Sequence, residues 1–198
     1  MRHFIREFLR APCATGAIAA SSGGLASVMA EASRLSNANV VVELGSGTGV
    51  FTERILQKLS NGTVFFVLEI NPRFVEKTRK RCPNVLIYND CASNIKSYLK
   101  KHGFEKCDCI ISGLPFGMFG DDQQRGLLGA ISEALSPDGE FLTFSYVGAK
   151  LLPAARRFKR NLKKAFSNVS QLPVVWRNIP PAIVYRCLSP AKVDQTVA

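Results

Sequence analysis

Short apolar runs alternate with amphipathic stretches along most of the chain, which predicts strands alternating with helices. The expected strands are Val40–Leu44, Val64–Glu69, Asn84–Tyr88, Cys107–Ile111, Glu140–Tyr146, Pro173–Arg177 and Ala182–Cys187. The expected helices are Phe51–Leu59, Pro72–Arg81, Ser93–Lys101, Asp122–Leu135 and Lys150–Phe166, preceded by Met1–Arg10 and Ser22–Arg34. Regular alternation of this kind predicts a parallel sheet with helices on both faces.

Composition limits the class of protein. A chain of 198 residues that is 46% hydrophobic forms one domain, and its apolar runs fall far short of the roughly 20 residues of a membrane span. The start, "MRHFIREFLRAP", carries Arg6, Glu7 and Arg10 where a signal peptide has its apolar region, so we expect a cytoplasmic protein. The six cysteines are then reduced thiols, and Cys107-x-Cys109 has no second ligand pair nearby, so we expect no metal.

Positive charge is concentrated in the last third of the chain. Between Phe141 and Val193 there are ten Lys or Arg residues and no Asp or Glu, out of a net charge of +11. A solvated helix face accounts for a few such residues, whereas an acid-free segment of this length is typical of contact with a polyanion. Nucleic acid and an anionic lipid surface are the two candidates.

The clearest chemical signal is the stretch "VVELGSGTGVFTERIL", a buried strand followed by a glycine-rich turn and an amphipathic helix. Gly45, Gly47 and Gly49 permit positive φ and close approach of a ligand to the backbone, and Glu43 precedes them. Glu69 ends the second strand, where a carboxylate can accept both hydroxyls of a ribose. Asp90, in "YNDCA", ends the third, so three ligand-facing strand ends coincide.

These motifs resemble those of class I S-adenosylmethionine-dependent methyltransferases over Val40 to about Tyr146. The resemblance implies a Rossmann-like α/β fold with a seven-stranded, mostly parallel sheet, helices on both faces and an antiparallel last strand. It also implies S-adenosylmethionine as cofactor, S-adenosylhomocysteine as product, and no metal. The implied cofactor residues are Glu43, Gly45, Ser46, Gly47, Gly49, Glu69, Ile70, Asp90 and Cys91. An NAD-binding or ligand-free sheet of the same kind is the alternative.

The stretch "ISGLPFGMF" follows the fourth strand at the edge where the methyl group is expected. It is similar to the Asn-Leu-Pro-Tyr loop of amino methyltransferases, with Ser112 and Gly113 in place of the Asn region. By that similarity Ser112 and Gly113 belong to the cofactor site, Leu114 and Pro115 contact the substrate, and Phe116 contacts the reacting group. Plain packing of the Pro-Phe corner is the alternative.

A second resemblance, to bacterial phospholipid N-methyltransferases, spans nearly the whole chain. It rests on "FLRAPCATGAIAASSGGLASVMAEA", "SGLPF", "FSYVG" and "NIPPAIVYR", with Ala20 where a Pro is expected before Ser21-Ser22. It implies methylation of phosphatidylethanolamine in one to three steps towards phosphatidylcholine, with Ser22 near the cofactor. The predicted organisation is an amphipathic helix and a cofactor-covering helix over residues 1–35, then a methyltransferase domain over 36–198, in one globular unit.

Two helical patterns suit a membrane surface. Phe4, Ile5, Phe8 and Leu9 form one face of the first helix with arginines around it, which is typical of an interfacial helix; the same face could instead cover the cofactor. The basic helix over 150–166 either lies on a leaflet or covers the core with a solvated basic face. We expect a peripheral protein at the inner face of the cell membrane, with anionic phospholipid as partner and no nucleic acid or protein partner.

The substrate residues are assigned by position. Tyr146 and Tyr185 are candidates to orient or deprotonate the amine, and both could instead be core residues. Phe116, Tyr146 and Trp176 are candidates for cation–π contact with a methylated head group. Lys150 and Arg186 are candidates for the lipid phosphate.

Two other functions remain open. An rRNA adenine N6-dimethyltransferase shares the glycine loop and the Leu-Pro-aromatic corner, and would use the basic segment as a phosphate track. The lack of Asn before Leu114 and of an RNA-binding domain after the seventh strand argues against it. A non-catalytic membrane scaffold is disfavoured by the complete set of predicted cofactor residues.

Overall fold

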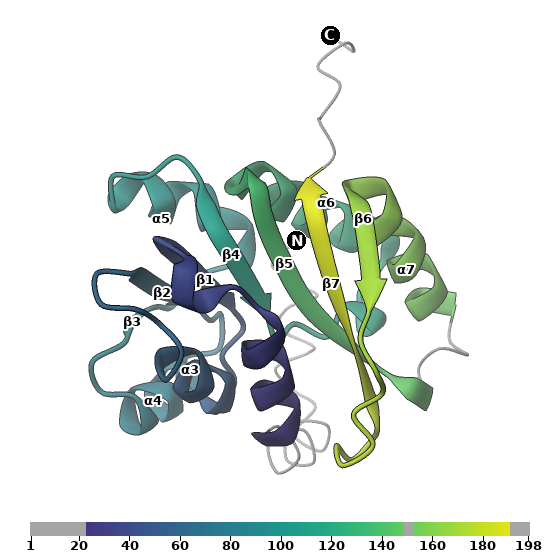
Figure 1. Ribbon diagram of the computed structural model, residues 1–198, viewed down its shortest axis with the longest axis horizontal. Coiled ribbons are helices and arrows are strands. Elements are labelled where there is room, and N and C mark those ends of the chain that lie inside the picture. Colours follow the sequence, from purple (N-terminus) through teal and green to yellow (C-terminus); the bar gives the residue numbers. More distant parts are fainter. Residues whose placement is uncertain (1–22, 149–152, 191–198) are drawn as a thin grey trace, which may run out of the picture.

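A computed structural model describes residues 23–148 and 153–190 of the chain (Figure 1). The strands are β1 (Val40–Leu44), β2 (Val64–Leu68), β3 (Leu86–Tyr88), β4 (Cys107–Ser112), β5 (Leu135–Tyr146), β6 (Phe166–Gln171) and β7 (Ala182–Pro190). The helices are α3 (Val50–Leu56), α4 (Pro72–Arg81), α5 (Ile95–Lys101), α6 (Asp121–Ala134) and α7 (Pro153–Ala165), and residues 23–32 are also helical. Single 3-10 turns are η1 (Leu35–Asn37), η2 (Ala92–Asn94) and η3 (Phe116–Met118).

The seven strands form one sheet in the order β3-β2-β1-β4-β5-β7-β6, with β3 at one edge and β6 at the other (Figure 1). The strands β1 to β5 pair in parallel, while β7 pairs antiparallel with both β5 and β6. The fold class predicted from the sequence is confirmed. Strand order reverses between β1 and β4, and open α/β sheets bind ligands at the carboxyl ends of strands beside such a reversal.

Alternating residues of the central strands supply two separate cores. Val40, Val42 and Leu44 of β1 point to the face covered by α5, α6 and α7. Val41 points to the opposite face, which is covered by the helix over residues 23–32 together with α3 and α4. All five residues of β1 are buried, which explains why its sequence is a continuous apolar run rather than an alternating one.

The sixth strand is not where the sequence predicted it. The predicted strand Pro173–Arg177 lies in the connection between β6 and β7, where Val175 alone forms an isolated bridge, to Ala182. The strand that pairs with β7 is instead the polar segment Phe166–Gln171. Because β6 is an edge strand whose residues after Phe166 are half-buried or exposed, backbone pairing holds it and an apolar pattern is not required.

The chain start is described only in part. The predicted helix Ser22–Arg34 corresponds to the helix over residues 23–32, whose Leu25 and Met29 are buried against the sheet. The predicted helix Met1–Arg10 lies outside the described residues, so the division at residue 35 stays a prediction. None of the helices within residues 23–148 and 153–190 combines the length and apolar character that a membrane crossing needs.

Candidate active site

Backbone hydrogen bonds continue the sheet one residue beyond β4, β1 and β2. Gly113, after β4, donates to the last carbonyl of β1 at 2.9 Å; Gly45, after β1, donates to the last carbonyl of β2 at 2.8 Å. Glu69, after β2, donates to the last carbonyl of β3 at 3.0 Å. The sheet register therefore brings predicted cofactor residues from three strands side by side.

The glycine turn needs its glycines for two different reasons. Gly45, Gly47 and Gly49 have φ angles of 79°, 56° and 81°, which favour glycine. A Cβ on Gly45 would lie 2.8 Å from Cδ2 of Leu114, so the turn packs directly on the corner after β4. A Cβ on Gly47 would meet nothing within 4 Å, so that side of the turn faces open space.

The other end of the turn is fixed to α4 by a residue that the sequence did not indicate. Thr78 of α4 donates a hydrogen bond to the hydroxyl of Ser46 at 2.9 Å and lies 3.3 Å from the carbonyl of Gly47. A Cβ on Gly49 would lie 3.1 Å from the Cα of Thr78. Glycine at this position therefore lets α4 approach the turn closely.

Glu43 lies beneath the turn with no solvent exposure. Its Oε2 accepts a hydrogen bond from the hydroxyl of Thr52 at 2.6 Å, and its Oε1 has no hydrogen-bond partner among the described residues. Burial raises the pKa of Glu43 to about 8; the Thr52 hydroxyl lowers it and the charge of Glu69 raises it further. A neutral carboxyl at pH 7 follows, until a cation comes close.

Glu69 is held by backbone amides on both sides. Its Oε2 accepts from the N–H of Gly47 at 3.0 Å and its Oε1 from the N–H of Asn71 at 2.8 Å. Burial raises the pKa of Glu69, against the lowering effect of the backbone groups of Asn71, Gly47 and Ile70. The carbonyls of Glu69 and Ile70 both accept from the side-chain amide of Asn89 at 2.9 Å, which fixes the chain after β2.

Asp90 is oriented by three donors. Its Oδ1 accepts from the N–H of Cys91 at 2.7 Å and the amide of Asn94 at 2.8 Å, and its Oδ2 accepts from the hydroxyl of Tyr98 at 3.0 Å. Burial alone would raise the pKa of Asp90, but these hydrogen bonds outweigh it and the pKa lies below its usual value. Asp90 is therefore a fixed carboxylate. It borders a polar surface depression lined also by Asn94, Ser97, Tyr98 and Lys101.

The corner after β4 divides into a part that meets the glycine turn and a part that enters the core. Ser112 is buried, and its hydroxyl accepts a hydrogen bond from the N–H of Leu114 at 3.2 Å. Pro115 precedes the turn η3. The ring of Phe116 is fully buried, stacked on Phe158 of α7 with ring centroids 4.6 Å apart. This packing assigns Phe116 to the core, in contrast to its predicted contact with the reacting group.

The two candidate tyrosines lie on opposite faces of the sheet. Tyr146, the last residue of β5, packs with Phe144 on the face of α3 and α4. Tyr185 is 3% exposed and packs against Phe158 on the face of α7. Burial raises the pKa of both tyrosines. One amine cannot meet both hydroxyls, and the half-buried Tyr146 at the carboxyl edge is the better placed of the two.

Arg186 has a structural partner. Its Nε and one terminal nitrogen donate to the same oxygen of Glu140 at 2.9 and 2.8 Å, and Glu140 is 1% exposed. Arg34 contacts that carboxylate from the chain start at 3.5 Å. Because a buried carboxylate strongly disfavours losing its cation, this pairing gives Arg186 a structural role, and its contact with a lipid phosphate stays a prediction.

Several predicted site residues cannot be placed. Those outside the described residues are Ser22 and Lys150 and the membrane-facing Phe4, Ile5, Phe8 and Leu9. Their roles stay predictions. Within residues 23–148 and 153–190, no group of three or more His, Cys, Asp and Glu residues could hold a metal ion.

The sequence profile of a protein family described as "Methyltransferase domain" matches residues 41–139, which include nearly all of β1, all of β2 to β4, and the carboxylates Glu43, Glu69 and Asp90. The chain belongs to this family. The ornithine lipid N-methyltransferase of Singulisphaera acidiphila is 29% identical to this methyltransferase over 187 residues, which are 93% of each chain.

Solved structures agree on the fold. The O-methyltransferase TomG of Streptomyces achromogenes, in complex with S-adenosylmethionine, has a TM-score of 0.67 and 15% identity over 83% of this chain and 79% of its own. The N-methyltransferase NodS of Bradyrhizobium japonicum WM9, in complex with S-adenosylhomocysteine, has a TM-score of 0.59 and 16% identity over 79% and 83%. The chain therefore has the fold of these methyltransferases, whose structures hold S-adenosylmethionine or its product.

The side chains at the carboxyl edge fit this cofactor. A carboxylate has about four acceptor positions. Glu69 uses one on each oxygen, which leaves the second of each for the two ribose hydroxyls, and Asp90 uses three, which leaves one for an adenine amino group. The unpartnered Oε1 of Glu43 and the open side of Gly47 leave acceptor capacity and room for the cationic amino-acid part.

Sequence inspection missed the residues that orient the glycine turn and the carboxylates. Thr78 holds the turn, while Tyr98 and the N–H of Asn71 orient Asp90 and Glu69. All three residues come from helices or their caps, at positions where their types have ordinary structural uses. A usable signal exists only for Asn71-Pro72, an N-cap followed by proline at the first helical position.

Proposed function

We propose that this methyltransferase N-methylates the primary amine of phosphatidylethanolamine, in one to three steps towards phosphatidylcholine, at the surface of a membrane. The observation that carries the proposal is the similarity to an ornithine lipid N-methyltransferase over 93% of both chains, including the flanks outside the matched family region of 41–139. Those flanks contain "FSYVG" and "NIPPAIVYR", segments in which a substrate site would differ between methyltransferases.

The cofactor would be held by Glu69 at the ribose, by Asp90 at the adenine with Cys91 beside it, and by the turn of Gly45 to Gly49 at the methionine part. When bound, it supplies an electrophilic methyl group on a sulfonium. Leu114 and Gly113 close the turn from the β4 side, because a larger residue at Gly113 would meet the carbonyl oxygen of Gly45 at 2.5 Å. The chain thus shapes the cofactor site mainly with backbone.

The remaining task of the protein is to present an unprotonated amine and exclude water. Tyr146 stands at the end of β5, beside the corner that follows β4. Its raised pKa keeps the phenol neutral, so its oxygen can accept an N–H and orient the amine while the proton passes to solvent. Orientation, rather than proton abstraction, is therefore the role we propose for Tyr146.

The lipid head group would be recognised through its phosphate and its amine. Phosphatidylethanolamine offers a phosphate beside the amine, but Arg186 is paired with Glu140. Lys150 therefore remains the proposed phosphate contact. Ornithine lipid, the substrate named for the relative, also carries a primary amine and is the second candidate. We place the protein peripherally at the inner face of the cell membrane, with residues 1–10 as an interfacial helix.

The test offers all acceptors at once. Purified protein receives methyl-deuterated S-adenosylmethionine together with total RNA and vesicles containing phosphatidylethanolamine, ornithine lipid and phosphatidylglycerol, and mass spectrometry follows the label. We expect label in phosphatidylethanolamine, with the number of deuterated methyl groups giving the number of steps. Label in ornithine lipid alone would replace the head group, and label in RNA adenine alone would overturn the lipid proposal.

Two variants make the assay specific. Glu69→Ala removes the proposed ribose contact and is expected to abolish labelling of every acceptor. Tyr146→Phe is expected to lower lipid labelling while cofactor affinity stays within twofold of wild type. Full turnover in Tyr146→Phe would remove the orienting role from this residue.

A further inference from the structure

The connection between β6 and β7, residues 172–181, exposes two large apolar side chains. Trp176 is 72% exposed and Ile179 is 75% exposed, the largest values among the exposed large apolar residues of the described chain. Met118, Leu86 and Leu56, at 56%, 48% and 40%, are less exposed and come from three separate elements. Single exposed apolar residues are ordinary, whereas two within four positions of one loop call for a physical reason.

The loop holds these side chains outward by its own hydrogen bonds. Val175 bridges to Ala182, and the N–H groups of Trp176 and Asn178 donate to the carbonyls of Val174 and Val175 at 3.1 and 3.2 Å. The side chain of Asn178 is 2% exposed and donates to the carbonyl of Pro180. One residue of the turn is thus buried as an anchor, while its neighbours on both sides point to solvent.

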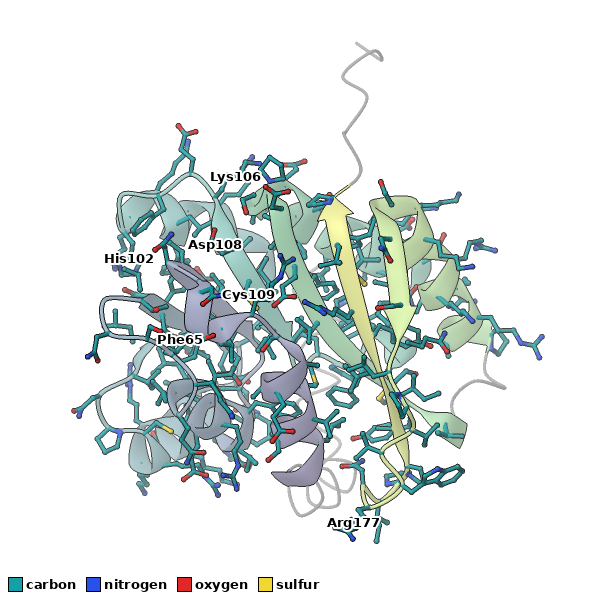
Figure 2. The ribbon with its side chains drawn as sticks, in the orientation of Figure 1. Phe65, His102, Lys106, Asp108, Cys109 and Arg177 are labelled. Atoms are coloured by element: carbon teal, nitrogen blue, oxygen red, sulfur yellow. The ribbon has the colours of Figure 1, made fainter. Side chains whose placement is uncertain are left out.

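The loop lies at the same edge of the sheet as the candidate active site. Its last residues lead into Ala182, which pairs with Tyr146 at the end of β5, and the N–H of Val147 donates to the carbonyl of Pro181 at 2.8 Å. Figure 1 shows the loop at the lower end of β6 and β7, and Figure 2 shows Arg177 at that extremity, directed away from the body of the protein. A flat surface approaching this edge meets the loop.

The chemistry of the exposed residues fits a lipid leaflet. Tryptophan favours the interface between head groups and acyl chains, and isoleucine favours the acyl side. Arg177 is exposed between them and supplies a cation for lipid phosphates. The chain has no acidic residue from Phe141 to Val193, so nothing in the loop or in α7 repels an anionic surface.

We propose that the β6–β7 loop inserts Trp176 and Ile179 into the head-group region of an anionic leaflet and so holds the opening of the active site against its lipid. The proposal rests on the proposed function in that the site takes its substrate from that leaflet. It assigns the contact to a loop of the folded domain, independently of residues 1–10.

Trp176 is the only tryptophan of the chain, so its fluorescence reports on this loop alone. Full-length protein is titrated with vesicles of phosphatidylethanolamine and phosphatidylglycerol, with and without bromine on the acyl chains. We expect a blue shift of the emission, quenching by brominated lipid and protection from iodide. Co-sedimentation with vesicles but unchanged emission would overturn the loop proposal, and so would a blue shift that depends on protein concentration without lipid, because it indicates a second copy as the occupant.

Variants of neighbouring residues test the same loop and keep the fluorescence of Trp176. Ile179→Ser and Arg177→Gln are each expected to weaken vesicle binding at least fivefold without changing cofactor affinity. Leu86→Ser, an equivalent change at an exposed residue of β3, is the control and should bind like wild type. Equal binding by Ile179→Ser and Leu86→Ser would overturn the proposal.

Methylation in detergent micelles separates this proposal from the proposed function. The loop variants should methylate lipid in micelles at the wild-type rate and lose rate only on vesicles. If the wild type inserts Trp176 but methylates no lipid in vesicles or micelles, the proposed function fails and the loop proposal stands. If lipid is methylated while Trp176 stays in water, the reverse holds.

Discussion

At the scale of single residues, Glu69 combines an anchor for the glycine turn with acceptor capacity for a ribose. Glu69→Gln keeps one acceptor oxygen but loses the charge, so hydrogen bonds worth about 1.5–3 kcal/mol are weakened. We expect the dissociation constant for S-adenosylmethionine to rise by about 10- to 100-fold, measured by titration calorimetry. The control is Glu105→Gln, at an exposed glutamate before β4. Unchanged affinity in Glu69→Gln would show that the ribose is held elsewhere.

Glu43 makes the stability of the cofactor-free protein depend on pH. Its pKa is about 8 in the folded protein, against an ordinary value of 4.5 for a glutamate in an unfolded chain, so between these values the folded state holds a proton that the unfolded state has lost. The free energy of unfolding therefore falls as pH rises from about 5 to about 8, by up to about 1.4 kcal/mol per pH unit, and levels off above.

Glu43→Gln removes this titration while keeping the shape of the side chain. We expect the variant to gain stability relative to wild type steadily from pH 5 to pH 8, measured by urea unfolding at several pH values. Parallel curves for the two proteins would mean that Glu43 is already ionised in the fold. The same variant should bind S-adenosylmethionine more weakly, because it cannot become an anion beside the cationic ligand.

At the scale of elements, the packing of α4 on the glycine turn makes a steric prediction. Gly49→Ala is expected to lower the free energy of unfolding for two reasons. Alanine is strained at the φ of 81°, and its Cβ would lie 3.1 Å from the backbone of Thr78. Gly62→Ala is destabilised only by the φ of 90°, since no atom lies within 4 Å of the added Cβ. Positive φ costs about 1–2 kcal/mol for alanine, so Gly62→Ala measures that cost and Gly49→Ala should exceed it by about 1 kcal/mol or more in urea unfolding. Equal losses would show that α4 moves aside freely.

Burial explains which elements the sequence predicted. The strand Val40–Leu44 and the helix Pro72–Arg81 have the predicted bounds, because a fully buried strand and a capped amphipathic helix leave strong patterns. Val174, Val175 and Trp176 favour strands, which predicts a strand over Pro173–Arg177. In the structure Trp176 is exposed and Val174 and Val175 are only partly buried, while the true edge strand is polar and depends on backbone pairing. Apolar content alone does not distinguish these cases.

The sequence also predicts only some of the candidate site residues correctly. Residues fixed by strand ends, such as Gly45, Glu69 and Asp90, lie together as predicted because parallel register brings strand ends together. Phe116 and Arg186 have the right chemistry near the right elements, yet their side chains point to an inner partner, Phe158 and Glu140. Which way a side chain points is decided by tertiary packing, which periodicity in a loop or a two-sided strand does not reveal.

At the scale of the whole molecule, one helix, α7, carries both exposed basic residues and side chains of the buried core. The buried residues of α7, including Phe158 and Leu162, belong to the core against the sheet, so this helix cannot also insert an apolar face into a membrane. The helix covers the core, and its exposed basic residues are free only for electrostatic attraction. Since α7 follows β5 and leads back to β6, its first turns lie nearest the edge that carries the candidate site (Figure 1).

Attraction of this kind depends on where the charge sits, which a pair of charge reversals can test. Arg156→Glu/Lys159→Glu reverses two exposed cations in the first turns of α7. As the control, Lys58→Glu/Lys106→Glu makes the same change of net charge at exposed residues in the connections that lead into β2 and β4, at the opposite edge of the sheet. Each cation near an anionic leaflet contributes about 1 kcal/mol, so the α7 pair should lose at least tenfold in vesicle binding and the control pair much less. Raising the salt to about 1 M shortens the Debye length to about 3 Å and should remove the difference between them. Equal losses in both pairs would mean that total charge, rather than the orientation imposed by α7, brings this methyltransferase to the membrane.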